Sequence, residues 1–179
     1  MFANTIFKKL ALEDCQPNLL AEFDRRQEVK RCWRREDGQW RLQDIAFVED
    51  WEQARKRRES QNIATCTRCG GAVIGAFLDG RLIGFSGVIH ELFGTNKAYA
   101  QLDMLHVSLP FRNQGIGKQL FHMACDQARL LGAKKLYISS HSAEETQAFY
   151  QAVGCRDADE IDPKLYEKEP LDRHLEFIL

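Results

Sequence analysis

The chain has 179 residues, of which 44% are hydrophobic and 28% charged, and its formal net charge at pH 7 is -1. A chain of this length and composition fits one domain, because it can bury enough apolar surface for a single core. The near-neutral charge argues against a nucleic-acid partner, which usually requires a strongly basic face, and no apolar run approaches the ~20 residues of a membrane span.

The N-terminal segment is predicted to contain a strand followed by a helix. Residues 6–10 have a strand pattern, and residues 17–26 place three apolar side chains on one helical face. The first nine residues contain no apolar stretch followed by a small-residue cleavage site, as a secretory signal peptide would. We therefore expect a cytoplasmic protein.

A β-hairpin is predicted over about residues 28–45. Asp37-Gly38 is a strong signal for a two-residue hairpin turn. Folding about this turn sets Trp33 opposite Leu42 and pairs an arginine with an aspartate further along, so the facing residues match in character.

A basic helix is predicted to begin near Asp50, and its charge run is typical of a solvated face. Cys66 and Cys69 follow with the spacing of half a zinc site or of a redox motif. No second Cys or His pair follows at a suitable distance, and a strand comes next where a redox motif needs a helix. We expect no metal and six reduced thiols.

Beyond residue 71 the pattern predicts an α/β fold with a mixed central sheet flanked by helices. A strand, a helix and a second strand between residues 98 and 139 imply a parallel crossover. Ser142 begins a Ser-Ala-Glu-Glu capping box that is expected to start a short helix. Strands are expected at 72–78, 81–90, 98–107, 135–139, 156–161 and 174–179, and helices at 117–131 and from 142 to before 154.

Residues 102–118 form the most informative segment, a strand that runs through a glycine-bearing loop directly into a helix. The first helical N–H groups have no intrahelical partner, and the helix dipole adds positive charge there. Gly115 and Gly117 remove side chains that would keep a phosphate from the backbone, and Arg112 and Lys118 are placed to reach an anion. The segment therefore predicts a phosphate or pyrophosphate site, and hence a phosphorylated cofactor.

Two common phosphate loops do not fit this segment. A dinucleotide fingerprint needs a third glycine where Leu120 stands, and a nucleoside-triphosphate loop needs Ser or Thr where Gln119 stands. Instead, Arg112-Asn-Gln-Gly-Ile-Gly117 resembles the Arg/Gln-x-x-Gly-x-Gly/Ala loop of the GNAT superfamily of N-acetyltransferases. Thr146-Gln-Ala-Phe-Tyr-Gln-Ala-Val-Gly154 resembles a second signature of that family, with Cys155 in place of the usual aromatic residue.

The resemblance implies an enzyme that moves an acetyl group from acetyl-coenzyme A (acetyl-CoA) to a primary amine of a small molecule or peptide. In the family the loop grips the pyrophosphate, and the preceding strand offers its backbone to the pantetheine arm. The residues that this implies for cofactor binding are Leu105, His106, Val107, Arg112, Asn113, Gln114, Gly115, Ile116, Gly117, Lys118 and Ser142.

The resemblance also implies catalytic roles. Tyr150 aligns with the family tyrosine that faces the sulfur and protonates the leaving thiolate, although the same residue is also placed to pack the helix on the sheet. Asp103 is the leading candidate for the general base, because Gln101 on the same strand face cannot accept the proton. His106, which alternation points to the opposite face, and Glu91 are further candidates.

The domain 1–179 is expected to divide into an acceptor side, residues 1–71, and an acetyl-CoA-binding core, residues 72–179. The acceptor is not identified by the sequence, although antibiotic-modifying members such as streptothricin acetyltransferases resemble this chain in carrying an aromatic insertion near the hairpin. The hairpin either borders the acceptor pocket or contacts a second subunit in a homodimer. Because Gln101 stands in place of an acid, a non-catalytic module that binds acetyl-CoA remains an alternative interpretation.

Overall fold

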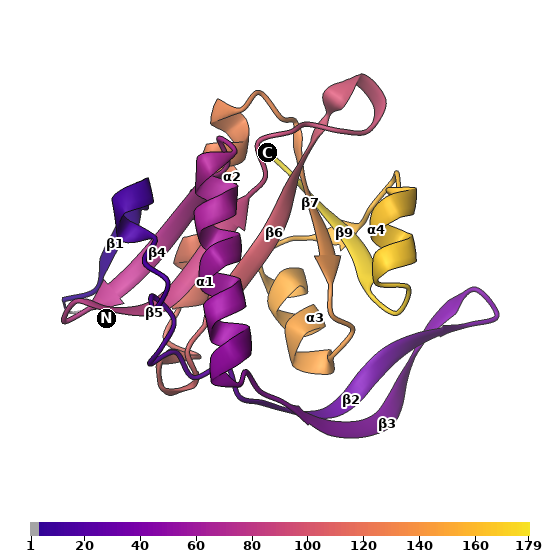
Figure 1. Cartoon of the computed structure of the whole chain (residues 1–179). Helices are drawn as coiled ribbons and strands as arrows, with labels where there is room; N and C mark the ends of the chain where they lie inside the picture. The colour runs from indigo at the N-terminus through magenta and orange to yellow at the C-terminus, as the bar shows by residue number, and fades with distance from the viewer. Residues whose placement is uncertain (1–3) are drawn as a thin grey trace.

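A computed structural model describes residues 4–179, which form a seven-stranded sheet of order β1-β4-β5-β6-β7-β9-β8 and a separate two-stranded sheet, β2-β3 (Figure 1). The strands are β1 (Ile6–Lys9), β2 (Gln27–Glu36), β3 (Gln39–Glu49), β4 (Ala72–Leu78), β5 (Arg81–Val88), β6 (Tyr99–Val107), β7 (Lys135–Ser140), β8 (Arg156–Asp157) and β9 (Arg173–Ile178). The helices are α1 (Gln53–Arg68), α2 (Ile116–Leu130), α3 (Glu144–Ala152) and α4 (Pro163–Lys168), with short 3-10 turns at η1 (Leu12–Asp14), η2 (Thr95–Lys97) and η3 (Leu109–Phe111).

Helices cover both faces of the large sheet, as the mixed α/β prediction required. On one face, at the front in Figure 1, α1 packs its buried Ile63 in the same core as Phe85 of β5. On the other face, α2 packs Phe121 in a core with Leu136 of β7, and α3 adds Tyr150 to that core. We call these the α1 face and the α2 face.

The parallel strands β6 and β7 pair only at their beginnings. Their register runs from Tyr99 opposite Lys135 to Gln101 opposite Tyr137 and then stops, whereas β7 continues to pair with β9 along its length. The edge of β6 that faces β7 has no strand partner beyond Gln101 among the described residues. We call this divergence of β6 and β7 the splay.

A β-bulge sits on β6 where the splay begins. Gly87 of β5 pairs with Met104 and the next residue pairs with Leu102, so Asp103 has no partner on β5. A bulge shifts the alternation of side chains, and accordingly Leu102 lies in the α2-face core while Met104 and His106 lie on the α1 face. The expectation that His106 points away from the face of Asp103 was therefore wrong.

The predicted hairpin is confirmed, including its register. Asp37 and Gly38 both have positive φ, as a two-residue hairpin turn requires, and Trp33 pairs with Leu42. The hairpin extends away from the large sheet beside α3 and α4 (Figure 1). Its root is fixed by an antiparallel bridge between Cys32 and Ala143.

Two local predictions were wrong, and one short helix was missed. Residues 17–26 form turns instead of a helix, since Leu19, Ala21 and Phe23 each bond the carbonyl three residues earlier. The capping box does not form, because Ala143 is the N-cap of α3 and the Ser142 hydroxyl accepts a hydrogen bond from the hairpin. The helix α4 was not predicted. Within residues 4–179, no helix is long and apolar enough to cross a bilayer.

Candidate active site

The loop before α2 has the backbone shape of an anion site. Asn113 and Gly115 are both left-handed, with φ of 59° and 84°. Gly115 is the N-cap of α2, and the first bond closing onto it is donated by Gln119 N to Gly115 O at 3.0 Å. The N–H groups of the first helical turn, from Ile116 onwards, therefore have no intrahelical partner. Converging N–H groups of this kind bind phosphate.

The charged side chains of the loop differ in role. Arg112 is turned inward: Nε donates to Val107 O at 2.9 Å and Nη2 donates to Arg25 O at 3.1 Å. Its guanidinium thus fixes the loop against β6. Lys118 is exposed and has no ion-pair partner within residues 4–179, so it is the cation that can meet an anion.

Gly117 allows α2 to approach α3. A Cβ at this position would lie 3.3 Å from Cε2 of Phe149, tighter than ordinary contact. A larger residue here would displace the Phe149 ring by a few tenths of an ångström, and Phe149 directly precedes the candidate acid Tyr150.

The pantetheine-binding stretch predicted on β6 lies at the unpaired edge of the splay. Leu105, His106 and Val107 pair with β5 on the other edge. The His106 ring lies against Trp51 and Phe85, with centroid distances of 4.9 and 5.4 Å. Burial lowers the pKa of His106 to about 3, so the ring is neutral and a poor proton acceptor at neutral pH.

Tyr150 lies on α3 beside the splay and is 7% exposed. Its ring packs against Phe121 and Phe149, and its hydroxyl has no hydrogen-bond partner among the described residues. Burial raises the pKa of Tyr150, with smaller contributions from the charges of Cys155 and Asp172. The phenol therefore stays protonated at neutral pH, as a general acid must.

Asp103 lies in the bulge at the start of the splay. Its carboxylate accepts a hydrogen bond from Gln101 Nε2 at 3.1 Å. The residue is exposed, yet desolvation by surrounding atoms raises its pKa, with Lys168 opposing and Glu59 adding to the effect. A raised carboxylate pKa suits a general base.

The other predicted residues lie elsewhere. Ser142 is buried under the hairpin, where its hydroxyl accepts from Arg34 Nη1 at 2.6 Å and its carbonyl from Trp33 N at 2.8 Å. Its geometry assigns it to hairpin docking. Glu91 lines a surface hollow of about 630 Å³ with the two cysteines Cys66 and Cys69, and the lining includes no residue of the loop before α2.

Residues after α4, which sequence reasoning missed, also reach this region. The Ser139 hydroxyl donates to Asp172 Oδ2 at 3.0 Å, and Tyr137 Oη lies 2.8 Å from His174 Nδ1. The last strand has polar residues at alternate positions, and a buried strand does not need polar residues for packing. This alternation was the only signal in the sequence that could have indicated these residues.

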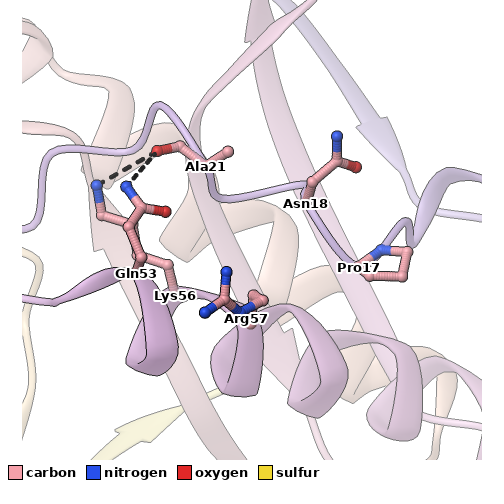
Figure 2. Close-up of a pocket in the computed structure, with 6 residues that line it drawn as sticks. All are labelled: Pro17, Asn18, Ala21, Gln53, Lys56 and Arg57. Atoms are coloured by element: carbon pink, nitrogen blue, oxygen red, sulfur yellow. Dashed lines mark hydrogen bonds between the residues drawn. The ribbon is translucent and has the colours of Figure 1, made fainter.

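A second, smaller pocket lies between the first turn of α1 and residues 17–21 (Figure 2). Gln53 and Lys56 both donate to Ala21 O there, at 3.5 and 3.4 Å. With about 90 Å³ it is far smaller than the ~300 Å³ of a small-molecule site. Within the described residues, no group of three or more His, Cys, Asp or Glu is placed to hold a metal.

The fold and the loop together define an acyltransferase that uses acetyl-CoA. The sequence model of the Acetyltransferase (GNAT) family matches residues 28–155, and the chain belongs to this family. The N-acetyltransferase resemblance is thereby confirmed at the level of the family. No curated protein shows significant sequence similarity to the chain.

Solved structures with the same fold cover almost the whole chain. Nourseothricin acetyltransferase has a TM-score of 0.69 at 16% identity, covering 97% of this chain and 96% of its own. A candidate streptothricin acetyltransferase from Bacillus anthracis str. Ames, solved with acetyl coenzyme A, has a TM-score of 0.69 at 14% identity, covering 98% and 97%. PaiA N-acetyltransferase from Thermoplasma acidophilum, solved with coenzyme A, has a TM-score of 0.60 at 16% identity, covering 98% and 99%.

Proposed function

We propose that the protein transfers the acetyl group of acetyl-CoA to a primary amine of a small molecule or peptide, by direct attack when both are bound. The observation that carries the proposal is the placement of three features around one opening in the sheet. The loop before α2, which we call the anion loop, follows the unpaired edge of β6. Tyr150 lies on the α2 face of the splay, and Asp103 lies on its α1 face.

Each reacting group then has a partner. Acetyl-CoA supplies an activated thioester, whose pyrophosphate fits the N–H groups of the loop. Asp103 accepts, directly or through a water molecule, the proton that the amine loses when its nitrogen bonds the carbonyl carbon. A free N–H on β6 stabilises the developing oxyanion. As the carbon–sulfur bond breaks, Tyr150 gives its proton to the sulfur.

The experiment that tests the proposal is thiol release from acetyl-CoA in the presence of a panel of amines. The panel contains polyamines, aminoglycosides, amino acids and peptides with free N-termini. We expect amine-dependent thiol release and an acetylated product by mass spectrometry. Binding of acetyl-CoA by calorimetry without release for any amine would establish a non-catalytic module instead.

Lys118 gives a direct test of the anion loop. We expect Lys118→Ala to weaken acetyl-CoA binding about fivefold, because a charge-assisted contact worth about 1 kcal/mol is lost. The salt dependence of binding should also decrease. Calorimetry at two salt concentrations measures both effects.

Lys134→Ala is the matched control for that test. Lys134 is also an exposed lysine, but it follows the opposite end of α2, ~22 Å from the loop. Equal losses in the two variants would mean that Lys118 acts only through the overall charge of the protein.

Asp103 gives a test based on pH. A base must be deprotonated, so kcat/KM is expected to fall as pH decreases through the pKa of Asp103, which burial raises above its usual value. Asp103→Asn should lower kcat about 10²-fold or more at neutral pH and remove this acid limb. A variant that keeps the wild-type pH profile would show that another group, or water alone, takes the proton.

A further inference from the structure

Asp172 and His174 lie together at the mouth of the splay on the α1 face. Ser139 of β7 is two residues beyond the last pair of β6 with β7, and it pairs with His174 of β9. The same Ser139 donates its hydroxyl to Asp172, which directly precedes β9. Asp103 occupies the corresponding position on β6, two residues beyond Gln101. The two carboxylates therefore flank the opening from opposite strands.

His174 carries a buried nitrogen that the protein does not satisfy. The residue is 6% exposed, and Nε2 has no hydrogen-bond partner among residues 4–179. Tyr137 Oη already accepts from Asp162 N at 3.1 Å, and its own hydrogen is satisfied if it donates to His174 Nδ1. That arrangement places a hydrogen on Nε2. A buried N–H without an acceptor is unfavourable, so an oxygen supplied by a ligand would stabilise it.

Asp172 carries a negative charge without a partner. No Lys, Arg or His within residues 4–179 forms an ion pair with it, and its hydrogen bond comes from neutral Ser139. Burial raises its pKa, the hydrogen bond from Ser139 and the charge of His141 oppose this, and the charges of Glu169 and, least, of Glu49 at the base of the hairpin add to it. The charge of Asp172 in turn raises the pKa of Tyr150. Asp172 is thus within electrostatic reach of the candidate acid on one side and of the hairpin on the other.

The hairpin reaches the segment that carries these two residues, but on the opposite side of the strand, because successive side chains alternate between the two faces. The Trp40 ring lies 5.2 Å from the guanidinium carbon of Arg173, the residue between Asp172 and His174. The guanidinium of Arg173 is held by Asp157 through two hydrogen bonds, of 2.6 and 3.1 Å, and so does not neutralise Asp172.

We propose that Asp172 and His174 form a recognition site for the acceptor, in which Asp172 binds a second ammonium group and Nε2 of His174 donates to an oxygen of the same molecule. This inference rests on the proposed function and defines its substrate class: an amine with a second amino group and a carbonyl or hydroxyl oxygen. β7 lies between the strands that carry Asp103 and Asp172, and β6 diverges from β7 here, so the backbones of the two residues are at least two strand spacings, ~10 Å, apart. That distance fits two amino groups separated by a chain of about five carbons.

Three simple acceptors separate the contribution of the second amino group from that of the oxygen. Lysinamide has two amino groups and a carbonyl oxygen, 1,5-diaminopentane has the two amino groups alone, and 6-aminohexanamide has one amino group and the carbonyl. We expect the wild-type protein to have its lowest KM for lysinamide. Asp172→Asn should raise KM about tenfold for the two diamines and less than twofold for 6-aminohexanamide.

The second arm uses His174→Phe, which should raise KM for the two amides and leave KM for 1,5-diaminopentane unchanged. If this variant does not fold, the wild-type KM ratio of 1,5-diaminopentane to lysinamide still tests the oxygen contact, and a ratio of one contradicts it. Asp126→Asn, an exposed carboxylate on α2, is the control and should change none of the three KM values.

The outcomes separate this inference from the function on which it depends. Thiol release with unchanged or uniformly raised KM values in Asp172→Asn would overturn the recognition site and leave the acetyltransferase intact. No thiol release from the wild-type protein with any amine would overturn the proposed function itself.

Discussion

Replacing Tyr150 with Phe is expected to lower kcat by about 10²–10⁴-fold, the usual contribution of a general acid. The substitution keeps the ring contacts with Phe121 and Phe149 and removes only the hydroxyl, which has no hydrogen-bond partner among the described residues. Folding and acetyl-CoA binding should therefore change little. Steady-state kinetics with saturating acceptor, together with calorimetry for acetyl-CoA, measure the two effects separately.

Tyr166→Phe is the control for Tyr150→Phe. It removes a hydroxyl from an exposed tyrosine on α4 that also has no hydrogen-bond partner among residues 4–179, and kcat should stay within twofold of the wild-type value. Because burial raises the pKa of Tyr150, deprotonation of this phenol should not limit kcat below pH 9. Wild-type turnover in Tyr150→Phe would show that the hydroxyl has no catalytic role and that Tyr150 serves only for packing.

Features with a local cause could be predicted from the sequence. The Asp37-Gly38 turn and the pairing of Trp33 with Leu42 depend on backbone preferences and on adjacent strands, and both are confirmed. The loop before α2 depends on glycine conformation and on unpaired N–H groups, and Gly115 has a left-handed conformation that glycine adopts readily. Neither feature needs contacts that are distant in sequence.

Features that depend on tertiary register could not be predicted. The bulge at Asp103 is visible only in the pairing of β6 with β5, and it reversed the expected side of His106. Arg112 turned inward because the carbonyl of Arg25, 87 residues earlier, is within reach. Ser142 accepts a hydrogen bond from the hairpin in preference to capping α3. In each case a partner distant in sequence outweighed the local preference.

The proposed acceptor site shows the same limit most clearly. Asp172 and His174 acquire their surroundings from Ser139 and Tyr137 on a neighbouring strand. The segment before His174 is polar and contains two prolines, so its sequence indicates only a loop, and the strand predicted from residue 174 does not reveal what the His174 side chain contacts. The cofactor side of such a site can thus be found from a local motif, whereas the acceptor side requires the fold.

The largest loss of stability is expected from Glu176→Gln. Glu176 on β9 is fully buried, and its carboxylate accepts hydrogen bonds from Tyr99 at 2.6 Å, Lys135 at 3.0 Å and Arg156 at 2.7 Å. Tyr99 and Lys135 are the first pair of β6 with β7, so this carboxylate ties together the strands at the closed end of the splay. Removing its charge leaves three donors facing a neutral amide inside the protein, although Lys135 and Arg156 keep their ion pairs with Asp159, and such a loss typically costs about 1–3 kcal/mol of unfolding free energy.

The pH dependence of stability gives an independent test of the same residue. Burial alone would raise the pKa of Glu176, but the hydrogen bonds from Tyr99, Arg156, the Asp159 backbone and Lys135 outweigh it and lower the pKa to about 2. A carboxylate with a lowered pKa stabilises the folded state above its unfolded pKa of ~4.3, and this contribution is lost as pH falls towards 2. Urea unfolding should therefore show wild-type stability decreasing below pH 5, with a smaller decrease in Glu176→Gln.

Asp126→Asn, which breaks an exposed ion pair with Arg129, is the control for Glu176→Gln and should cost less than about 0.5 kcal/mol of unfolding free energy. Equal losses in the two variants would show that the buried network does not hold β6, β7 and β9 together.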